Sequence, residues 1–331
     1  MSRRTGAVAL VLSLVMMAVV VGAPSASAAR LPGTTCRLFP ADNVWNTRVN
    51  KLPVHASSAK WLASMGSSTT KLHPDYGPAS GGAQPYGIPW QIVSPSAPLI
   101  NLEFTWPDES DAGPYPLTGS TPIEGGSDRH AIMVNPSTCT LYELYDTRYR
   151  PTAQSTAGSG AIWKLSSNVL RPGGWTSADA AGLPILPGLV NYDEVMAGAM
   201  NHAIRVTASC TSRSYLWPAR HQAGQANSQC PPMGARFRLK SNFKLPSSTC
   251  AAPCQTVITT MKRYGLILAD NGSNWYFTGT SDTRWTGDQV NQLKQIPANQ
   301  FQAVNQSCIK VSAGSGRAFQ PGTSEFVARC T

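Results

Sequence analysis

Candidate catalytic residues lie on either side of the Asn-Pro-Ser-Thr sequence at residues 135–138. This sequence is a turn signal between two alternating apolar runs and predicts a β-hairpin with a four-residue loop. Counting outward from the loop pairs His130 with Glu143 and Asp128 with Tyr145. Because side chains on a strand alternate with a period of two, these four residues share one face with the apolar residues near the turn.

Such a face could carry acid–base chemistry. A histidine–glutamate pair beside a second carboxylate, at the end of an apolar face, supplies groups whose pKa can be shifted. Two carboxylates would suit glycoside hydrolysis, with one as acid and the other as base or nucleophile. His130 with Tyr145 and Arg129 would instead suit proton abstraction from a uronate by a lyase. The alternative is a cross-strand polar pair of His130 and Glu143 on the solvent side, and a register slip of one residue would undo the pairing.

A second group of acids, Asp108, Glu109 and Asp111, follows a predicted strand and enters a proline-rich loop. These residues could bring a carboxylate to a sugar cleft or oxygen ligands to Ca²⁺, but their spacing is not specific for either. An exposed acidic loop is the commoner arrangement. We expect no cofactor and no metal site, and calcium stays an unsupported alternative.

Aromatic and basic residues provide candidates for substrate binding. The sequence Trp-Pro-Ala-Arg-His at residues 217–221 lies between two cysteines, which suits a ligand-binding rim or simple local packing. The chain has nine tryptophans, and we expect most of them in the core and two or three along a cleft. The candidate substrate-binding residues are Arg129, Tyr145, Trp217, Arg220 and His221.

The first 28 residues have the pattern of a secretory signal peptide. An n-region with Arg3 and Arg4 precedes an apolar stretch at residues 7–21, and Ala-Ser-Ala at residues 26–28 is a cleavage site. The apolar stretch of about 15 residues is shorter than the roughly 20 residues that span a bilayer. We therefore expect a secreted, extracellular protein with no membrane contact once the signal peptide is removed.

All eight cysteines follow this leader, and an even number in an oxidising compartment predicts that all are paired. Short separations along the chain favour three pairs, and the two remaining cysteines give the fourth. The predicted disulfides are Cys250 with Cys254, Cys210 with Cys230, Cys308 with Cys330, and Cys36 with Cys139. This pairing leaves no thiol nucleophile, and the sequence has no Cys-x-x-Cys zinc pair, Gly-x-Ser-x-Gly elbow or His-Glu-x-x-His motif.

The chain carries a formal net charge of +10, which becomes +8 when the two arginines of the leader are removed. This excess suits an anionic extracellular polysaccharide, or it serves solubility alone. No run of Lys or Arg indicates nucleic-acid binding. We expect a monomer.

Turn-rich loops separate most of the elements that the sequence predicts. The predicted fold is a mainly β domain with peripheral helices, as a β-sandwich or jelly roll, over residues 29–305, followed by a disulfide-stapled extension at residues 306–331. Capping signals predict helices at residues 191–200, 255–264 and from 287 to the proline at 297. The predicted strands cover residues 99–106, 130–134, 140–146, 161–165, 202–207, 236–243, 266–269 and 275–278.

Four sequence blocks together resemble a family of secreted proteins common in actinobacteria and other soil bacteria. The blocks are Phe-Pro-Ala-Asp-Asn-Val-Trp-Asn at residues 39–46, residues 166–189, Trp-Pro-Ala-Arg-His at residues 217–221, and residues 262–272. The resemblance covers roughly residues 38–304 and leaves the C-terminal segment outside. It implies secretion and a single domain, and it brings no assigned activity or catalytic residues.

The leading functional hypothesis is a secreted carbohydrate-active enzyme that cleaves a polysaccharide as a glycoside hydrolase does. Its candidate catalytic residues are Asp108, Glu109, Asp128, His130 and Glu143. A non-catalytic cell-wall or polysaccharide-binding protein, a uronate polysaccharide lyase, and a secreted protein-binding or inhibitory protein are the alternatives.

Overall fold

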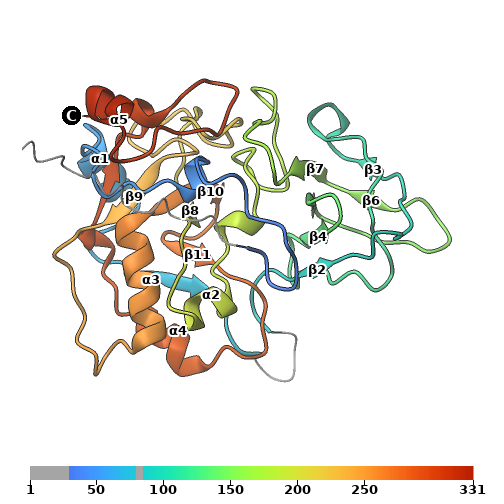
Figure 1. Cartoon of the computed structure of the whole chain (residues 1–331), viewed down its shortest axis with the longest axis horizontal. Coiled ribbons are helices and arrows are strands. Elements are labelled where there is room, and N and C mark those ends of the chain that lie inside the picture. Colours follow the sequence, from blue (N-terminus) through green and yellow to red (C-terminus); the bar gives the residue numbers. More distant parts are fainter. Residues whose placement is uncertain (1–29, 80–84, 331) are drawn as a thin grey trace, which may run out of the picture.

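The computed structural model describes residues 30–79 and 85–330, so the predicted signal peptide lies outside the described residues. Two sheets occupy different halves of the molecule (Figure 1). One half is built from residues that precede residue 80 and follow residue 165, and the other half from the intervening part of the chain. The mainly β character that the sequence predicts is confirmed.

The larger half contains a six-stranded sheet that mixes parallel and antiparallel pairs. The two parallel pairs are β1 with β11 and β8 with β10. The central strand β8 is buried along its whole length, because packing covers both faces of the sheet there. In spatial order the strands are β1 (His73–Asp75), β11 (Tyr276–Thr278), β8 (Ile204–Ala208), β10 (Leu266–Asn271), β9 (Arg236–Leu239) and β12 (Phe301–Val304).

Helices cover this sheet, and their ends largely follow the capping signals. Helix α4 (Gly287–Leu293) begins with the predicted capping box of Thr286 and Gln289. Helix α3 (Ala252–Arg263) begins three residues before the predicted start and packs against β9, α2 and α4. Helix α2 (Tyr192–Met196) ends earlier than predicted. The other helices among the described residues are α1 (Ser58–Ser64), α5 (Ser324–Cys330) and the 3₁₀ turns η1 (Val44–Asn46), η2 (Pro107–Glu109), η3 (Leu186–Gly188), η4 (Ala298–Gln300) and η5 (Ser307–Ile309).

The smaller half contains a four-stranded sheet in the order β2 (Trp90–Ile92), β4 (Ala131–Asn135), β5 (Thr140–Tyr145) and β7 (Ser159–Lys164). A two-stranded parallel sheet of β3 (Glu103–Phe104) and β6 (Thr156–Ala157) accompanies it. Both large sheets mix parallel and antiparallel pairs, so the finer prediction of a β-sandwich or jelly roll is not confirmed.

The predicted hairpin exists, but its register differs from the prediction by two residues. Glu143 lies opposite Ile132 rather than His130, because Asn135 pairs with Thr140 and the loop is formed by residues 136–139. A shift by two residues leaves every side chain on its original face. His130, Glu143 and Tyr145 therefore keep the common face that the sequence predicts.

The four predicted disulfides are confirmed, with Cα–Cα distances of 5.4, 5.5, 5.2 and 5.2 Å for Cys36–Cys139, Cys210–Cys230, Cys250–Cys254 and Cys308–Cys330. The C-terminal segment also packs against the rest of the protein, in addition to its disulfide bond. Gln306 is buried and donates to the carbonyls of Trp217 and Gly234. Phe326 also joins the main hydrophobic core.

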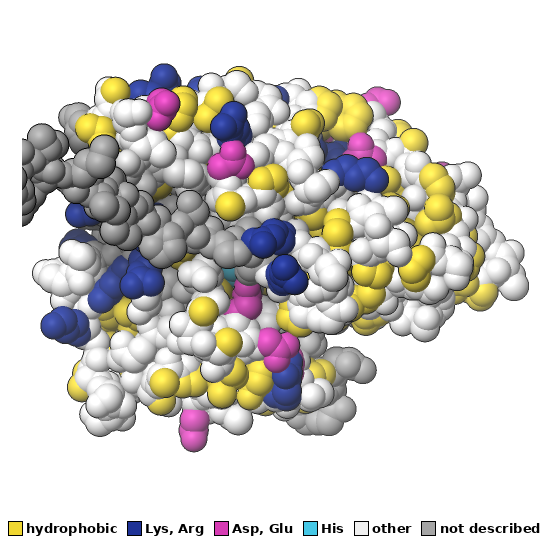
Figure 2. Space-filling view, viewed as in Figure 1, with side chains coloured by type: hydrophobic (Ala, Val, Ile, Leu, Met, Phe, Trp, Pro, Cys, Tyr) yellow, Lys and Arg dark blue, Asp and Glu magenta, His cyan; other side chains and the backbone are white. Residues whose placement is uncertain are grey.

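On the face shown in Figure 2, the half that contains the four-stranded sheet is mostly uncharged, with scattered hydrophobic side chains. Lys and Arg lie singly or in small groups, chiefly over the other half. Within residues 30–79 and 85–330, no helix is both long enough and apolar enough to cross a membrane.

Candidate active site

A pocket of about 390 Å³ lies where the two halves meet. Its walls come from seven separate segments of the chain, which the fold brings together around the C-terminal end of β10. Three carboxylates and one histidine line it, together with two aromatic rings. The lining residues are Trp106, Glu109, Asp128, Tyr145, Ser159, Thr176, Ser177, Ala178, Ala180, His221, Ala223, Asp270 and Asn271.

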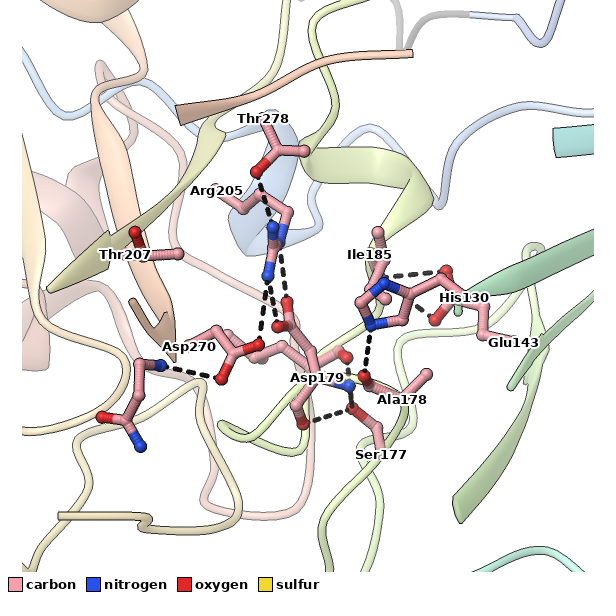
Figure 3. Close-up of polar contacts among 12 residues, drawn as sticks. His130, Glu143, Ser177, Ala178, Asp179, Ile185, Arg205, Thr207, Asp270 and Thr278 are labelled. Carbon is pink, nitrogen blue, oxygen red and sulfur yellow. Dashed lines mark hydrogen bonds and ion pairs between the residues drawn. The ribbon is translucent and has the colours of Figure 1, made fainter. Parts of the chain in front are cut away.

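Asp270 enters the pocket from the end of β10 and belongs to a buried charge cluster (Figure 3). Behind it, Arg205 on β8 donates from Nε and Nη2 to the two carboxylate oxygens of Asp179, at 2.9 and 2.5 Å. The same Nη2 lies 3.5 Å from Oδ2 of Asp270, and Nη1 donates to the hydroxyl of Thr278 at 2.6 Å. Two carboxylates thus share one guanidinium.

This arrangement raises the pKa of Asp270. Its side chain is 23% exposed, whereas that of Asp179 is fully buried. Burial and the negative charge of Asp179 raise the pKa of Asp270 to about 8, although the charge of Arg205 opposes the shift. The Asp179–Asp270 pair therefore holds a proton to a higher pH than a free carboxyl group does, and Asp270 is the member of the pair that lines the pocket.

Glu109 and His221 form a second pair of pocket groups. The imidazole Nδ1 of His221 lies 2.8 Å from the carbonyl of Ala180, so this nitrogen carries a proton and donates to that carbonyl. That Nε2 lies 3.7 Å from Oε2 of Glu109. The same carboxylate oxygen accepts the backbone N–H of Thr176 at 3.1 Å, which fixes the orientation of the carboxylate.

Aromatic rings form another wall of the pocket. Trp106 is 48% exposed, and its ring centroid lies 6.2 Å from that of Tyr145. Asp128 lines the pocket beside them and is exposed. An exposed indole next to carboxylates is an arrangement that suits stacking against the apolar face of a sugar ring.

The structure buries the two residues at the centre of the sequence-based hypothesis. Glu143 is 0% exposed and accepts the backbone N–H groups of Ile185 and Leu186 and the indole N–H of Trp163. Burial raises its pKa to about 7, against the effect of these donors. The prediction of an open catalytic face at Glu143 does not match this position, because its carboxylate has three protein donors and does not line the pocket.

His130 is also buried, at 2% exposure. Its Nδ1 lies 2.5 Å from the Glu124 carboxylate and its Nε2 lies 3.1 Å from the Ala178 carbonyl. Burial alone would lower the pKa of His130, but the hydrogen bond and charge of Glu124 outweigh it and raise the pKa. His130 and Glu143 therefore anchor the two ends of segment 178–186, and Ala178 lines the pocket (Figure 3).

Several other predicted residues lie outside the pocket. Asp108 is exposed in η2, and the Nε of Arg129 donates to the carbonyl of Thr147. Asp111 pairs with Arg171. Trp217 and Arg220 instead hold the C-terminal segment by donating to the carbonyls of Ser315 and Ala313. Of the predicted site residues, the pocket brings together Glu109, Asp128, Tyr145 and His221.

The prediction from sequence missed Asp270, Asp179 and Arg205. One signal was present, because Arg205 interrupts the apolar run of β8 and a charged residue in a buried strand requires a partner. Asp270 also ends the apolar strand Leu-Ile-Leu-Ala and precedes an Asn-Gly turn.

Within the described residues, no three His, Cys, Asp or Glu side chains are placed to hold a metal ion together. Comparisons with protein-family models, with curated proteins and with solved structures find no match to this chain.

Proposed function

We propose that the protein is a secreted enzyme that cleaves a polysaccharide by glycoside hydrolysis, with the pocket around Asp270 as its active site. The observation that carries this proposal is the convergence of Asp270, Glu109 and Asp128 on one pocket beside an exposed indole. Glycoside hydrolysis requires carboxyl groups in different protonation states around one bond.

In the proposed mechanism, Asp270 is the general acid. Its raised pKa keeps the proton available at neutral pH, and this proton passes to the glycosidic oxygen as the bond to the anomeric carbon breaks. Glu109, oriented by Thr176 and paired with His221, is the group that accepts the proton of an attacking water. Trp106 provides the stacking surface that holds the sugar ring in place.

The charges of the pocket favour a neutral or amino sugar. Among residues 30–79 and 85–330, no Lys or Arg lines it, so a uronate carboxylate would face Glu109, Asp128 and Asp270 without a cation in contact. This composition gives no support to the uronate lyase alternative, in which a cation is expected to neutralise the substrate carboxylate.

The test is a screen of the purified protein, residues 29–331 with its disulfides intact, against neutral, amino-sugar and uronate polysaccharides. Hydrolysis releases reducing ends without unsaturated products, whereas a lyase gives products with the ultraviolet absorbance of a double bond. Binding without any product formation would contradict the enzymatic proposal and favour a polysaccharide-binding protein. Export is tested separately, by N-terminal sequencing of protein recovered from culture medium, where we expect Ala29 first.

A further inference from the structure

A second hollow, of about 650 Å³, is lined by other residues of the loop 210–230 that also carries His221. Its opposite wall is formed by α1 and by the residues that precede this helix. We call it the basic groove and define it by His55, Lys60, Trp61, Ser212, Arg213 and Ser214. One disulfide-closed loop thus borders two hollows.

The charges of the two hollows are opposite. Among the residues that the structure describes, the basic groove is lined by Lys60 and Arg213 and by no Asp or Glu. Neither of these two side chains forms an ion pair or a hydrogen bond within the described part of the chain. Two cations without a protein partner on one concave surface leave their charge available to a ligand.

His55 adds a fixed hydrogen-bond donor to these charges. Its Nδ1 accepts the backbone N–H of Ser57 at 3.0 Å, so the ring proton is on Nε2. The ring stacks on the buried indole of Trp61, with centroids 4.3 Å apart and an interplanar angle of 22°. Burial and the charge of Lys60 lower the pKa of His55, which keeps the ring neutral with Nε2 as donor.

The hydroxyl groups of Ser212 and Ser214 lie 2.8 Å apart on the facing wall. Hydroxyl, ammonium, guanidinium and imidazole N–H groups are the donors that bind phosphate and carboxylate oxygens in proteins. These donors line one groove together, and no acidic residue among them would repel an anion, so the groove favours a negatively charged ligand.

We propose that the basic groove binds the oxyanion groups of an extracellular polymer, either phosphodiesters or uronate carboxylates. The anionic group binds between Lys60 and Arg213 and accepts hydrogen bonds from His55 and from the one serine hydroxyl that does not donate to the other. This binding site is separate from the pocket around Asp270, and its occupation requires no turnover. The proposal therefore stands or fails independently of the hydrolytic function.

Affinity electrophoresis and calorimetry on the disulfide-bonded protein test this proposal with three probes: poly(glycerol phosphate), polygalacturonate and neutral dextran. We expect binding to at least one polyanion, weakening at higher salt, and no binding to dextran. The polyanion that binds identifies the source of the oxyanion. The double variant Lys60→Gln/Arg213→Gln should bind this polyanion at least about tenfold more weakly than the wild type, because charge-assisted hydrogen bonds are lost.

A matched control is the double variant Arg150→Gln/Lys244→Gln, which removes the same charge at exposed positions outside the groove. We expect it to bind as the wild type does, with circular dichroism confirming that both variants are folded. Equal weakening in the two variants would show attraction by net charge alone and overturn the assignment. Absence of binding to both polyanions would also overturn it.

Discussion

Asp179 and Asp270 share the guanidinium of Arg205, whose Nη2 lies 2.5 Å from one carboxylate and 3.5 Å from the other. The closer contact belongs to the buried Asp179, so Asp270 is the less compensated of the two. The relationship explains why an acid in contact with an arginine holds a proton near neutral pH. The pH dependence of activity should therefore report the pKa of Asp270 within this cluster.

The first prediction concerns the alkaline limb of the pH–rate profile. Because a general acid must be protonated, we expect kcat/KM to fall as the pH rises through about 8, the pKa of Asp270. Asp179→Asn removes a negative charge that raises this pKa, so the limb should move to lower pH. A limb that stays in place or moves to higher pH would contradict the assignment of Asp270, whatever the effect of the variant on protein yield.

The second prediction concerns Glu109 and its partner. Glu109→Gln should lower kcat by about 10²–10⁴-fold, the range typical of a lost acid–base group, with little change in substrate binding. His221→Gln should lower kcat less, because the carboxylate keeps its hydrogen bond from Thr176. Single-turnover kinetics and equilibrium binding separate these effects. Glu103→Gln, at an exposed position outside the pocket, should behave as the wild type.

The third prediction concerns protein stability and Glu143. Its pKa of about 7 in the folded state is above the value near 4.3 of an unfolded chain, so the folded state holds the proton more strongly. The free energy of unfolding should therefore fall as the pH rises from about 4 through 7. Glu143→Gln should remove up to about 4 kcal/mol of this fall, measured by urea unfolding across the pH range.

The control for this measurement is again Glu103→Gln, which should leave the dependence on pH unchanged. If Glu143→Gln shows the same fall as the wild type, Glu143 does not titrate as the structure indicates. Glu143 anchors segment 178–186 and does not contact the substrate. We therefore expect Glu143→Gln to lose activity only as far as the fraction of folded protein falls, with kcat of the folded protein unchanged.

The fourth prediction concerns the disulfide that closes the loop bordering both hollows. Cys210→Ser/Cys230→Ser should lower the free energy of unfolding by about 3 kcal/mol, as expected for a loop of this length. It should also weaken ligand binding at the pocket and at the basic groove, since the loop supplies His221 to one and Arg213 to the other. Cys250→Ser/Cys254→Ser, which opens a short loop whose cysteines line neither hollow, should leave binding unchanged. Equal loss of binding in both variants would point to global destabilisation.

Local signals in the sequence predicted much of the architecture. The capping box at Thr286, the hairpin around residues 135–140 and the four disulfides all depend on residues close in sequence or on simple pairing rules. Short strands such as β2 and β12 were not predicted, because a run of three or four residues carries too little alternation to be recognised.

The active-site pocket was only partly predictable, for a physical reason. The sequence placed His130 and Glu143 on one face, but these side chains bind segment 178–186, which lies more than 40 residues further along the sequence. The alternation of residues within a hairpin cannot predict a contact with a segment so far away in the sequence. The cluster of Asp179, Arg205 and Asp270 likewise joins three distant segments, and only the fold brings them together.

The most direct test of the account is the effect of Asp270→Asn on the release of reducing ends from a polysaccharide that the wild type cleaves. If Asp270 is the general acid, kcat falls by about 10²–10⁴-fold while the polysaccharide still binds, and Asp288→Asn, at an exposed position on α4, retains full activity. Full hydrolytic activity in Asp270→Asn would contradict the assignment of the active site.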